Sequence, residues 1–454
     1  MKRWLMFAGV IFGVLGVGIP LVCYWAVLRF VEGPLLTKWL ESRIAEMTGG
    51  ETTVMPLEWK GFAAYSEGIE VRGGEGLKRA RLDQWRGEVN ARALFWERVW
   101  RLQGLEAQRL LIELADQSDG QGERTERRDG EGSFTFDQVP WWLWWLPTRL
   151  EWGSALIREV EMLWPIGKGM RGELKGMTVT LRPRDGGWDV LGRGGKLRAG
   201  EFPQVRVVEL RGRLREPYFF ITEGRWQSEE GGGEGLVTGE LALDGERSSR
   251  LNIQAKDVPI RDVVGGDWRA RFHGKVEGHV DLMREEKQKA ADGRWKGVGK
   301  LLVREGMIEG LPWLETWARY TGLDEYRRLR LTTAEADVIV DEGGGVIFRN
   351  IRLESSGVVR VEGRVSVKEA KVEGELEVGL TDGQVRLIPA GKERIFTRNA
   401  EGYLWAVPPM RVYGTVNDVQ EDLSGRVGSA VVDEVQRKIE SGAEKILERV
   451  RSLF

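Results

Sequence analysis

Few residues of this chain could carry out chemistry, and their spacing does not bring them together. The sequence contains two histidines, His273 and His279, and a single cysteine, Cys23. Because residues six apart on one strand are separated by about 20 Å, we do not expect the histidines to share a metal ion, and one cysteine does not form a thiolate metal site. No Gly-x-Ser-x-Gly segment that would support a serine nucleophile is present. We predict no catalytic residue, no metal site and no cofactor, and therefore a protein that is not an enzyme.

One glycine-rich segment matches a nucleotide-binding pattern, but its context does not fit. Residues Gly167–Gly172 read Gly-x-Gly-x-x-Gly, and in dinucleotide-binding folds a helix begins at this motif and binds phosphate with its N-terminus. The residues that follow, around Val179 and Leu181, alternate as in a strand. The formal net charge is −2, with basic and acidic residues interspersed, so we expect no nucleic-acid partner either.

The N-terminal residues predict a membrane anchor. An uncharged run from Trp4 to Leu28 follows Met1, Lys2 and Arg3. A helix of that length measures about 38 Å, enough to cross a hydrocarbon core of about 30 Å. A cleaved signal peptide is the alternative, although its apolar region is usually shorter. Lys2 and Arg3 favour a cytoplasmic N-terminus, so we predict an anchor in residues 1–30, with a single span at about 4–28 and the bulk of the chain outside the cytoplasm.

Three segments with different patterns follow the anchor. Pro34 and helically spaced apolar residues, ended by Thr48-Gly49-Gly50, predict an amphipathic helix at 34–48 that either caps a sheet or lies on the membrane surface. In residues 51–116, apolar and polar residues alternate in short runs separated by glycines, which predicts strands. Residues 117–133 are almost free of apolar side chains, which predicts a disordered loop.

A cluster of tryptophans opens the middle of the chain, residues 134–295. The segment 140–147 contains Trp141, Trp142, Trp144 and Trp145 between two prolines. Tryptophan is favoured at membrane interfaces and binding surfaces because it combines a large apolar ring system with an N–H donor. These four residues are candidates for membrane or lipid contact, and an aromatic plug in the protein core is the alternative.

The clearest alternation lies at 359–367 and 372–380. Valine, leucine and glycine occupy one set of alternate positions, and mainly charged residues occupy the other. This pattern is typical of an antiparallel sheet with one apolar face, which a second sheet, a helix or a non-protein ligand must cover. The candidate residues for lining that face are Val359, Val361, Val365, Val367, Val372, Leu376, Val378 and Leu380.

Two helical segments accompany these strands. Apolar residues at helical spacing predict a helical hairpin at 311–326, broken at Gly322. A second apolar stripe predicts an amphipathic C-terminal helix at 427–454. This second helix either packs on the end of the sheet, or binds a membrane surface or a partner helix.

Several of these segments together resemble one family. The membrane helix, Trp59-Lys60-Gly61-Phe62, Gly68-Ile69-Glu70-Val71 and Ala80-Arg81-Leu82-Asp83 resemble the N-terminal region of AsmA-like bacterial envelope proteins. Residues 299–314 and 348–365 resemble the family's C-terminal region, which we place at 296–425. The resemblance implies a protein of the inner membrane with a periplasmic body. It also implies a relationship to bridge-like lipid carriers, whose curved sheet forms an apolar groove for acyl chains.

The resulting expectation is a mainly β protein with an N-terminal transmembrane helix, an elongated, curved, mostly antiparallel sheet and a C-terminal amphipathic helix. Its expected role is to bind or conduct phospholipid in support of the outer membrane, with the inner membrane as partner. Other envelope proteins or the opposite membrane are further partners, reached through the C-terminal helix. The alternative is an assembly scaffold with a fully self-covered core. On the lipid hypothesis, Val361→Glu or Leu376→Glu abolishes lipid association without unfolding the protein, whereas an ordinary core would unfold.

Overall fold

The computed structural model describes residues 34–451, with internal gaps. The gaps fall at residues 75, 91, 94–96, 98, 116–148, 168–169, 200–203, 230–231, 244–246, 265–267, 286–294, 342–343, 389–393 and 417. The predicted membrane span, the predicted loop at 117–133 and the four clustered tryptophans lie outside the described residues. In the part that is described, no helix combines the length and the apolar character needed to cross a membrane.

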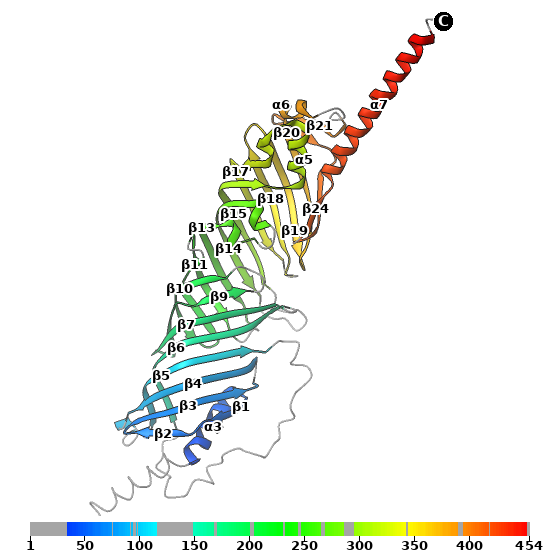
Figure 1. The fold of residues 1–454 in the computed structure, drawn as a ribbon. Coiled ribbons are helices and arrows are strands. Elements are labelled where there is room, and N and C mark those ends of the chain that lie inside the picture. The colour runs from blue at the N-terminus through cyan, green and yellow to red at the C-terminus, as the bar shows by residue number, and fades with distance from the viewer. Residues whose placement is uncertain are drawn as a thin grey trace, which may run out of the picture. The chain divides into compact units, whose positions relative to one another are not determined.

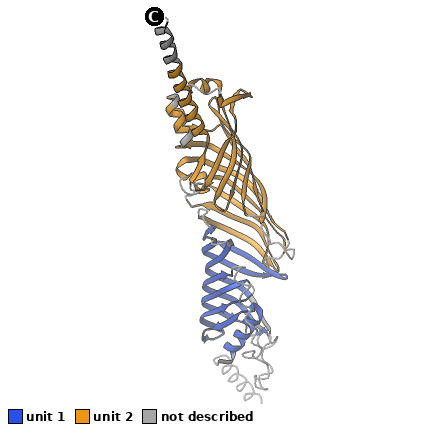
Figure 2. Ribbon diagram, turned by 90° about the vertical axis from the view of Figure 1, so that its right-hand side faces the viewer, with its two compact units in different colours: residues 1–200 blue, residues 201–454 orange. Residues whose placement is uncertain are grey.

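The chain is mainly β, as predicted, and forms two compact units, residues 1–200 and 201–454 (Figures 1 and 2). The described part of the first unit starts with helix α3, at the range predicted from the sequence, and continues with a sheet. Its elements are α3 (Pro34–Thr48), β1 (Glu51–Val54), β2 (Leu57–Lys60), β3 (Ala63–Arg72), β4 (Leu77–Val89), β5 (Val99–Leu114), β6 (Arg149–Gly167), β7 (Met170–Arg184), β8 (Gly187–Arg193) and β9 (Lys196–Ala199).

Strands β5 and β6 form a parallel pair, whereas the other strand pairs within this unit are antiparallel. A parallel pair needs a crossover of a dozen or more residues, and residues 115–148 provide that length. Strand β6 ends at Gly167, and β7 begins at Met170 and pairs with it. Gly167 and Gly172, the first and last residues of the Gly-x-Gly-x-x-Gly segment, therefore lie on two paired strands, and the strand predicted after it is confirmed.

In the second unit, the described strands pair in antiparallel fashion in the order β10-β11-β12-β13-β14-β15-β17-β18-β19-β20-β23-β24. The strands are β10 (Val205–Arg215), β11 (Tyr218–Ser228), β12 (Glu234–Ala242), β13 (Ser249–Pro259), β14 (Phe272–Arg284), β15 (Trp295–Glu309), β16 (Arg328–Arg330), β17 (Thr333–Val340), β18 (Val346–Ser355), β19 (Val359–Lys368), β20 (Lys371–Thr381), β21 (Phe396–Ala400), β22 (Tyr403–Ala406), β23 (Met410–Thr415) and β24 (Asp418–Glu421).

Short helices interrupt this sheet, and a long helix follows it. They are η6 (Ile260–Asp262), α4 (Trp268–Arg271), α5 (Pro312–Thr321), η7 (Asp324–Arg327), α6 (Asp382–Leu387) and α7 (Leu423–Arg451). Proline occupies the start of α5, and Gly322 ends it at φ 72°, a left-handed conformation that glycine adopts without strain. Helix α5 and η7 occupy the predicted 311–326 segment. Helix α7 begins at Leu423, four residues before the predicted 427.

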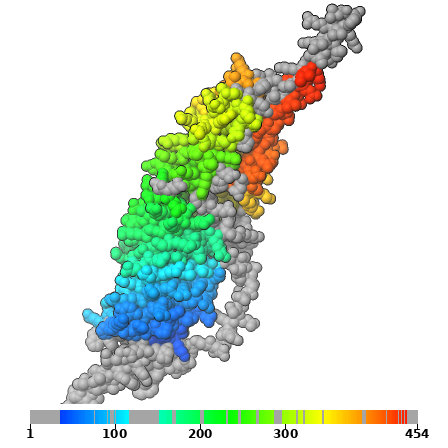
Figure 3. All heavy atoms as spheres, viewed as in Figure 1, coloured from blue at the N-terminus to red at the C-terminus, as the bar shows by residue number. Residues whose placement is uncertain are grey.

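Among the described residues, helix α7 packs onto the second unit through its first turns. Leu423 and Val427 are buried, whereas Val432 and Ile439 are 62% and 67% exposed. The space-filling view shows the described turns of α7 along one side of this unit (Figure 3). The beginning of α7 therefore belongs to the core of the second unit, and the described side chains farther along the helix face solvent.

Candidate functional site

The candidate site is the apolar face of the sheet in residues 201–454. Directly paired residues point to the same face of a sheet, and one row of such pairs crosses eight strands from β13 to β23. The row is Ile253, Val280, Gly299, Val338, Phe348, Val365, Gly374 and Val412. The alternating pattern of each strand thus adds up to a continuous apolar surface.

Glycines in this surface make room for the large side chains beside them. A Cβ added at Gly299 would lie 2.8 Å from a methyl carbon of Val280, and one added at Gly374 would lie 2.9 Å from a methyl carbon of Val365. Both distances are too short for carbon atoms that are not bonded. The valines therefore spread sideways over the glycines.

The opposite face of the same strands is polar and forms interactions between strands. Arg304 Nε lies 2.8 Å from Glu277 Oε2, and Lys300 Nζ lies 3.6 Å from Glu335 Oε2. The Asn252 amide donates a hydrogen bond of 2.6 Å to Asp281, and the Asn350 amide donates one of 2.7 Å to Asp337. The sheet thus has one face suited to water and one face that requires an apolar cover.

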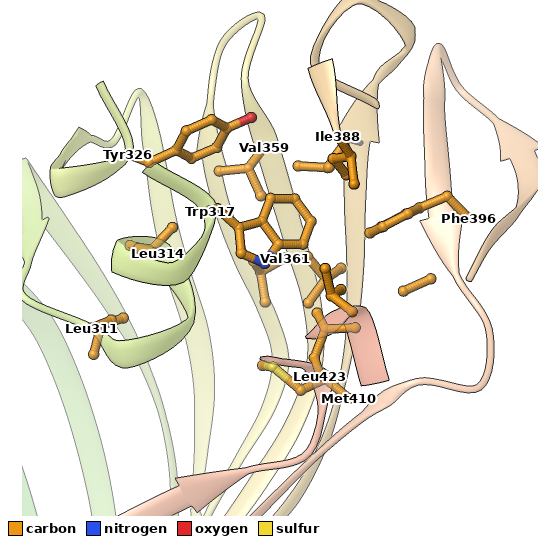
Figure 4. Close-up of a cluster of buried hydrophobic side chains, with 14 of the residues drawn as sticks. Leu311, Leu314, Trp317, Tyr326, Val359, Val361, Ile388, Phe396, Met410 and Leu423 are labelled. Atoms are coloured by element: carbon orange, nitrogen blue, oxygen red, sulfur yellow. The ribbon is translucent and has the colours of Figure 1, made fainter. Parts of the chain in front are cut away.

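Protein side chains cover one end of the apolar face (Figure 4). We call this region the capped end: the buried cluster formed by residues of β15, β16 and β19–β23 with residues of α5, η7, α6 and α7. The Trp317 ring packs edge-on against Phe396 and Tyr326, with centroid distances of 5.5 and 6.0 Å. Four predicted lining residues are buried here, Val359, Val361, Val378 and Leu380, so the material that covers them is protein.

The other predicted lining residues lie farther along the same strands. Val365 and Val367 on β19 are half-buried, as is Leu376, which packs at the margin of the capped end. Val372 is 6% exposed. Half-buried residues that the sequence analysis did not select continue the surface on neighbouring strands, and the same alternation would have identified them: Leu251, Ile253, Val280, Leu282, Leu301 and Phe348. We call Val365, Val367 and these six residues the open face.

A hydrogen bond joins helix α4 to the residue that follows β23. Trp268 Nε1 on α4, just before β14, donates to the Val416 carbonyl after β23 at 2.8 Å. Strands β14 and β23 are six steps apart in the sheet, about 29 Å if the sheet were flat. Trp268 of α4 and Phe272, the first residue of β14, both pack against the buried cluster on the apolar side. No sequence signal identified Trp268 for this contact.

Two ionisable groups stand at the capped end. Burial raises the pKa of Tyr326, whose hydroxyl donates to Gln384 Oε1 at 2.5 Å, so the phenol stays neutral. Glu421 precedes α7 and accepts hydrogen bonds from the N–H groups of Leu423 and Ser424 at 2.6 and 3.0 Å. Burial raises the pKa of Glu421, although these two hydrogen bonds act in the opposite direction.

The two histidines take separate positions on β14. His273 Nε2 lies 2.9 Å from Glu309 Oε1, and His279 is exposed and paired with Lys300. Within the described ranges, no group of three or more His, Cys, Asp or Glu side chains is arranged to hold a metal ion.

A separate apolar cavity lies in the first unit, between α3 and strands β2–β5. Its volume is about 120 Å³, and its lining consists of apolar and tryptophan side chains. From the helix, Leu36 and Trp39 pack onto the sheet with 3% and 6% exposure. The indole N–H groups of Trp59 and Trp85, which line the cavity, are buried and have no hydrogen-bond partner among the described residues.

Comparisons of the chain with protein-family models, with curated proteins and with solved structures found no match.

Proposed function

We propose that this protein binds phospholipid acyl chains along the open face and holds or conducts lipid in the cell envelope without catalysis. The half-buried state of the open face is the observation that carries the proposal, because large apolar side chains that share one face of a sheet favour an apolar cover. The resemblance of the sequence to AsmA-like envelope proteins also supports a role in lipid binding.

The proposed mechanism is passive. An acyl chain displaces water from Val280, Phe348, Val365 and their neighbours, and each methylene group removed from water contributes about 0.8 kcal/mol. The head group stays in water, beyond the apolar row. Movement along the row needs no chemical step, because neighbouring valine and leucine side chains offer similar surroundings. Its direction is set by a lipid gradient or by partner proteins.

The location that fits this function is the inner membrane, with residues 4–28 as a single span, the N-terminus in the cytoplasm and the body in the periplasm. The uncharged run and the preceding Lys2 and Arg3 support this arrangement. Phospholipid is then the ligand, and the membrane is its source. The groove-like form of the sheet belongs to the same proposal and is supported by the Trp268–Val416 contact.

A second candidate function is an assembly scaffold for envelope proteins. The capped end favours it, because there the protein covers its own apolar face completely, with Val378 and Leu380 both at 0% exposure. On this hypothesis another protein covers the open face as α5 covers the capped end. The two candidate functions differ in whether lipid or protein lies against Val365.

Photo-crosslinking in the full chain distinguishes these functions. A benzophenone amino acid replaces Val365 or Phe348 in cells, and the adducts are identified by mass spectrometry. Two matched controls lie close by: Arg364, the exposed neighbour on the polar face of β19, and Val378, buried in the capped end. We expect phospholipid adducts at positions 365 and 348 and none at either control. Protein adducts at 365 and 348 without lipid would support the scaffold, and lipid adducts of equal yield at 364 would refute a specific lipid-binding face.

A further inference from the structure

The cavity beneath α3 is an incompletely filled space at the start of the body. Apolar cavities of about 150 Å³ stay dry and bind small apolar molecules such as benzene. The cavity here, at about 120 Å³, has room for a few carbon atoms of a chain and not for a whole lipid. Its lining by leucine, isoleucine, valine, alanine and tryptophan side chains favours an apolar occupant.

Helix α3 covers this cavity mainly by apolar packing, through the buried side chains of Leu36 and Trp39. Among the described residues, a hydrogen bond from the Val54 N–H to Glu41 Oε1, at 3.0 Å, also joins the helix to the sheet edge. Beneath the helix, the N–H groups of Trp59 and Trp85 have no partner in the described part of the chain, and both they and the unfilled volume cost free energy. Lifting α3 would give these donors access to water, which lowers the cost of opening.

The position of the cavity in the chain indicates which occupant reaches it. The uncharged run Trp4–Leu28 ends shortly before Pro34, and only residues 29–33 lie between that run and α3. If the run spans the membrane, the short connection keeps α3 close to the bilayer surface. Acyl chains are then the most concentrated apolar molecules near the cavity.

We propose that the space under α3 receives the terminal carbons of an acyl chain from a membrane phospholipid, and that α3 is the lid through which lipid enters. This inference rests on the proposed lipid function, which it extends by naming an entry site. It assigns a binding role to Leu40, Ile44 and Leu105, which line the cavity.

The test uses the full chain in vesicles of phosphatidylethanolamine and phosphatidylglycerol. A small fraction of the lipid carries a diazirine at the end of one acyl chain, and mass spectrometry locates the adducts after illumination. We expect adducts on the cavity side of α3, at Leu40 and Ile44, and across the cavity at Leu105. Lys38 and Met47, exposed on the same helix, serve as internal controls for contact with the bilayer surface.

A substitution that fills the cavity provides a second test of the entry site. Ala64, 3% exposed, lines the cavity, so Ala64→Phe occupies its volume. We expect about a tenfold loss of cavity adducts, equivalent to the loss of two buried methylene groups. Glu58→Phe adds the same ring at an exposed position of β2 and should leave the adducts unchanged. Leu105→Phe is a second filling variant if Ala64→Phe fails to fold.

The outcomes separate this inference from the proposed function. Adducts at Phe348 and Val365, with none at Leu40, Ile44 or Leu105, would overturn the entry site and leave lipid binding by the open face intact. Labelling at Lys38 and Met47 that equals or exceeds labelling at Leu40 and Ile44 would also overturn it. Cross-links from a photo-reactive residue at Leu40 to residues 134–148 of the chain would show that the protein fills its own cavity.

Discussion

Strands β19 and β20 carry the same alternating pattern along their length, yet their two halves have different surroundings. Towards the capped end, Val361 and Leu380 lie among Trp317, Phe396 and other side chains and are 5% and 0% exposed. Four residues farther along the same faces, Val365 and Leu376 are half-buried. The compared residues are all apolar and lie on the same face of their strand. What differs is how much of each side chain other protein residues cover.

An alternating strand therefore indicates that its apolar face must be covered, but it does not indicate what covers that face. At the capped end, residues of α5, α6 and α7 provide it, because Pro312 and Gly322 fix the bounds of α5. At the open face the described residues leave the cover incomplete. Substitutions matched between the two halves can therefore separate a role in folding from a role in ligand binding.

The largest difference is expected for a charge placed in each half of β19. Val361→Glu puts a carboxylate into the buried cluster, which we expect to cost more than about 3 kcal/mol of unfolding free energy or to prevent folding. Denaturant unfolding of the full chain in detergent measures the loss. This expectation replaces the one derived from the sequence, in which Val361→Glu leaves the protein folded, because Val361 is covered by protein.

At Val365, the same substitution should affect lipid more than stability. The half-buried position lets the Val365→Glu carboxylate reach water, so we expect a loss of unfolding free energy below about 1 kcal/mol. Lipid adducts at the neighbouring Phe348 should fall about tenfold, because a charge in the row disfavours acyl chains. Equal destabilisation by Val361→Glu and Val365→Glu would contradict the distinction between the two halves.

Two alanine substitutions on β20 compare how much side-chain packing contributes to stability in each half of the strand. Leu380→Ala should lower the unfolding free energy by about 2–5 kcal/mol, because it leaves a cavity in a tightly packed cluster. Leu376→Ala should cost less than half as much, since Leu376 lies at the margin and keeps part of its surface in water. Thermal unfolding of both variants, measured side by side, checks the ratio.

One hydrogen bond from Trp268 joins α4 to the residue after β23. Trp268→Phe keeps an aromatic ring near Phe272 and removes the N–H that reaches the Val416 carbonyl. We expect a loss of about 1 kcal/mol in stability and faster hydrogen exchange at the end of β23. Unchanged exchange at Val416 would indicate that other contacts hold this end of the sheet.

The smallest expected effect is a pH dependence at the start of α7. Burial raises the pKa of Glu421 above its ordinary value of 4.5, so the folded state binds this proton more tightly than the unfolded state does. The resulting stabilisation is complete below pH 4.5 and is lost as the pH rises through the raised pKa. Glu421→Gln keeps an oxygen acceptor for Leu423 and Ser424 and should remove this slope. Unfolding midpoints across that pH range, compared with those of wild type, provide the measurement.

Local patterns predicted the elements that local physics controls. The helix at 34–48, the helical interruption near Gly322 and the strands containing Val365 and Leu376 lie where proline, glycine and side-chain periodicity placed them. The sequence pattern did not predict that β5 and β6 pair in parallel, because the alternation of apolar and polar residues does not indicate the direction of a partner strand. The start of α7 at Leu423 depends on the cap from Glu421, which the apolar stripe alone did not indicate.

The sequence by itself determined which residues share a face, because the strand period of two places Val359, Val361, Val365 and Val367 on one side regardless of their neighbours. Only the tertiary structure decided which of them are enclosed by protein, because that depends on where helices distant in sequence pack and how far the sheet bends. Trp268 and Val416 lie 148 residues apart, and no periodic pattern connects them. The division between a capped end and an open face is therefore a property of the folded sheet.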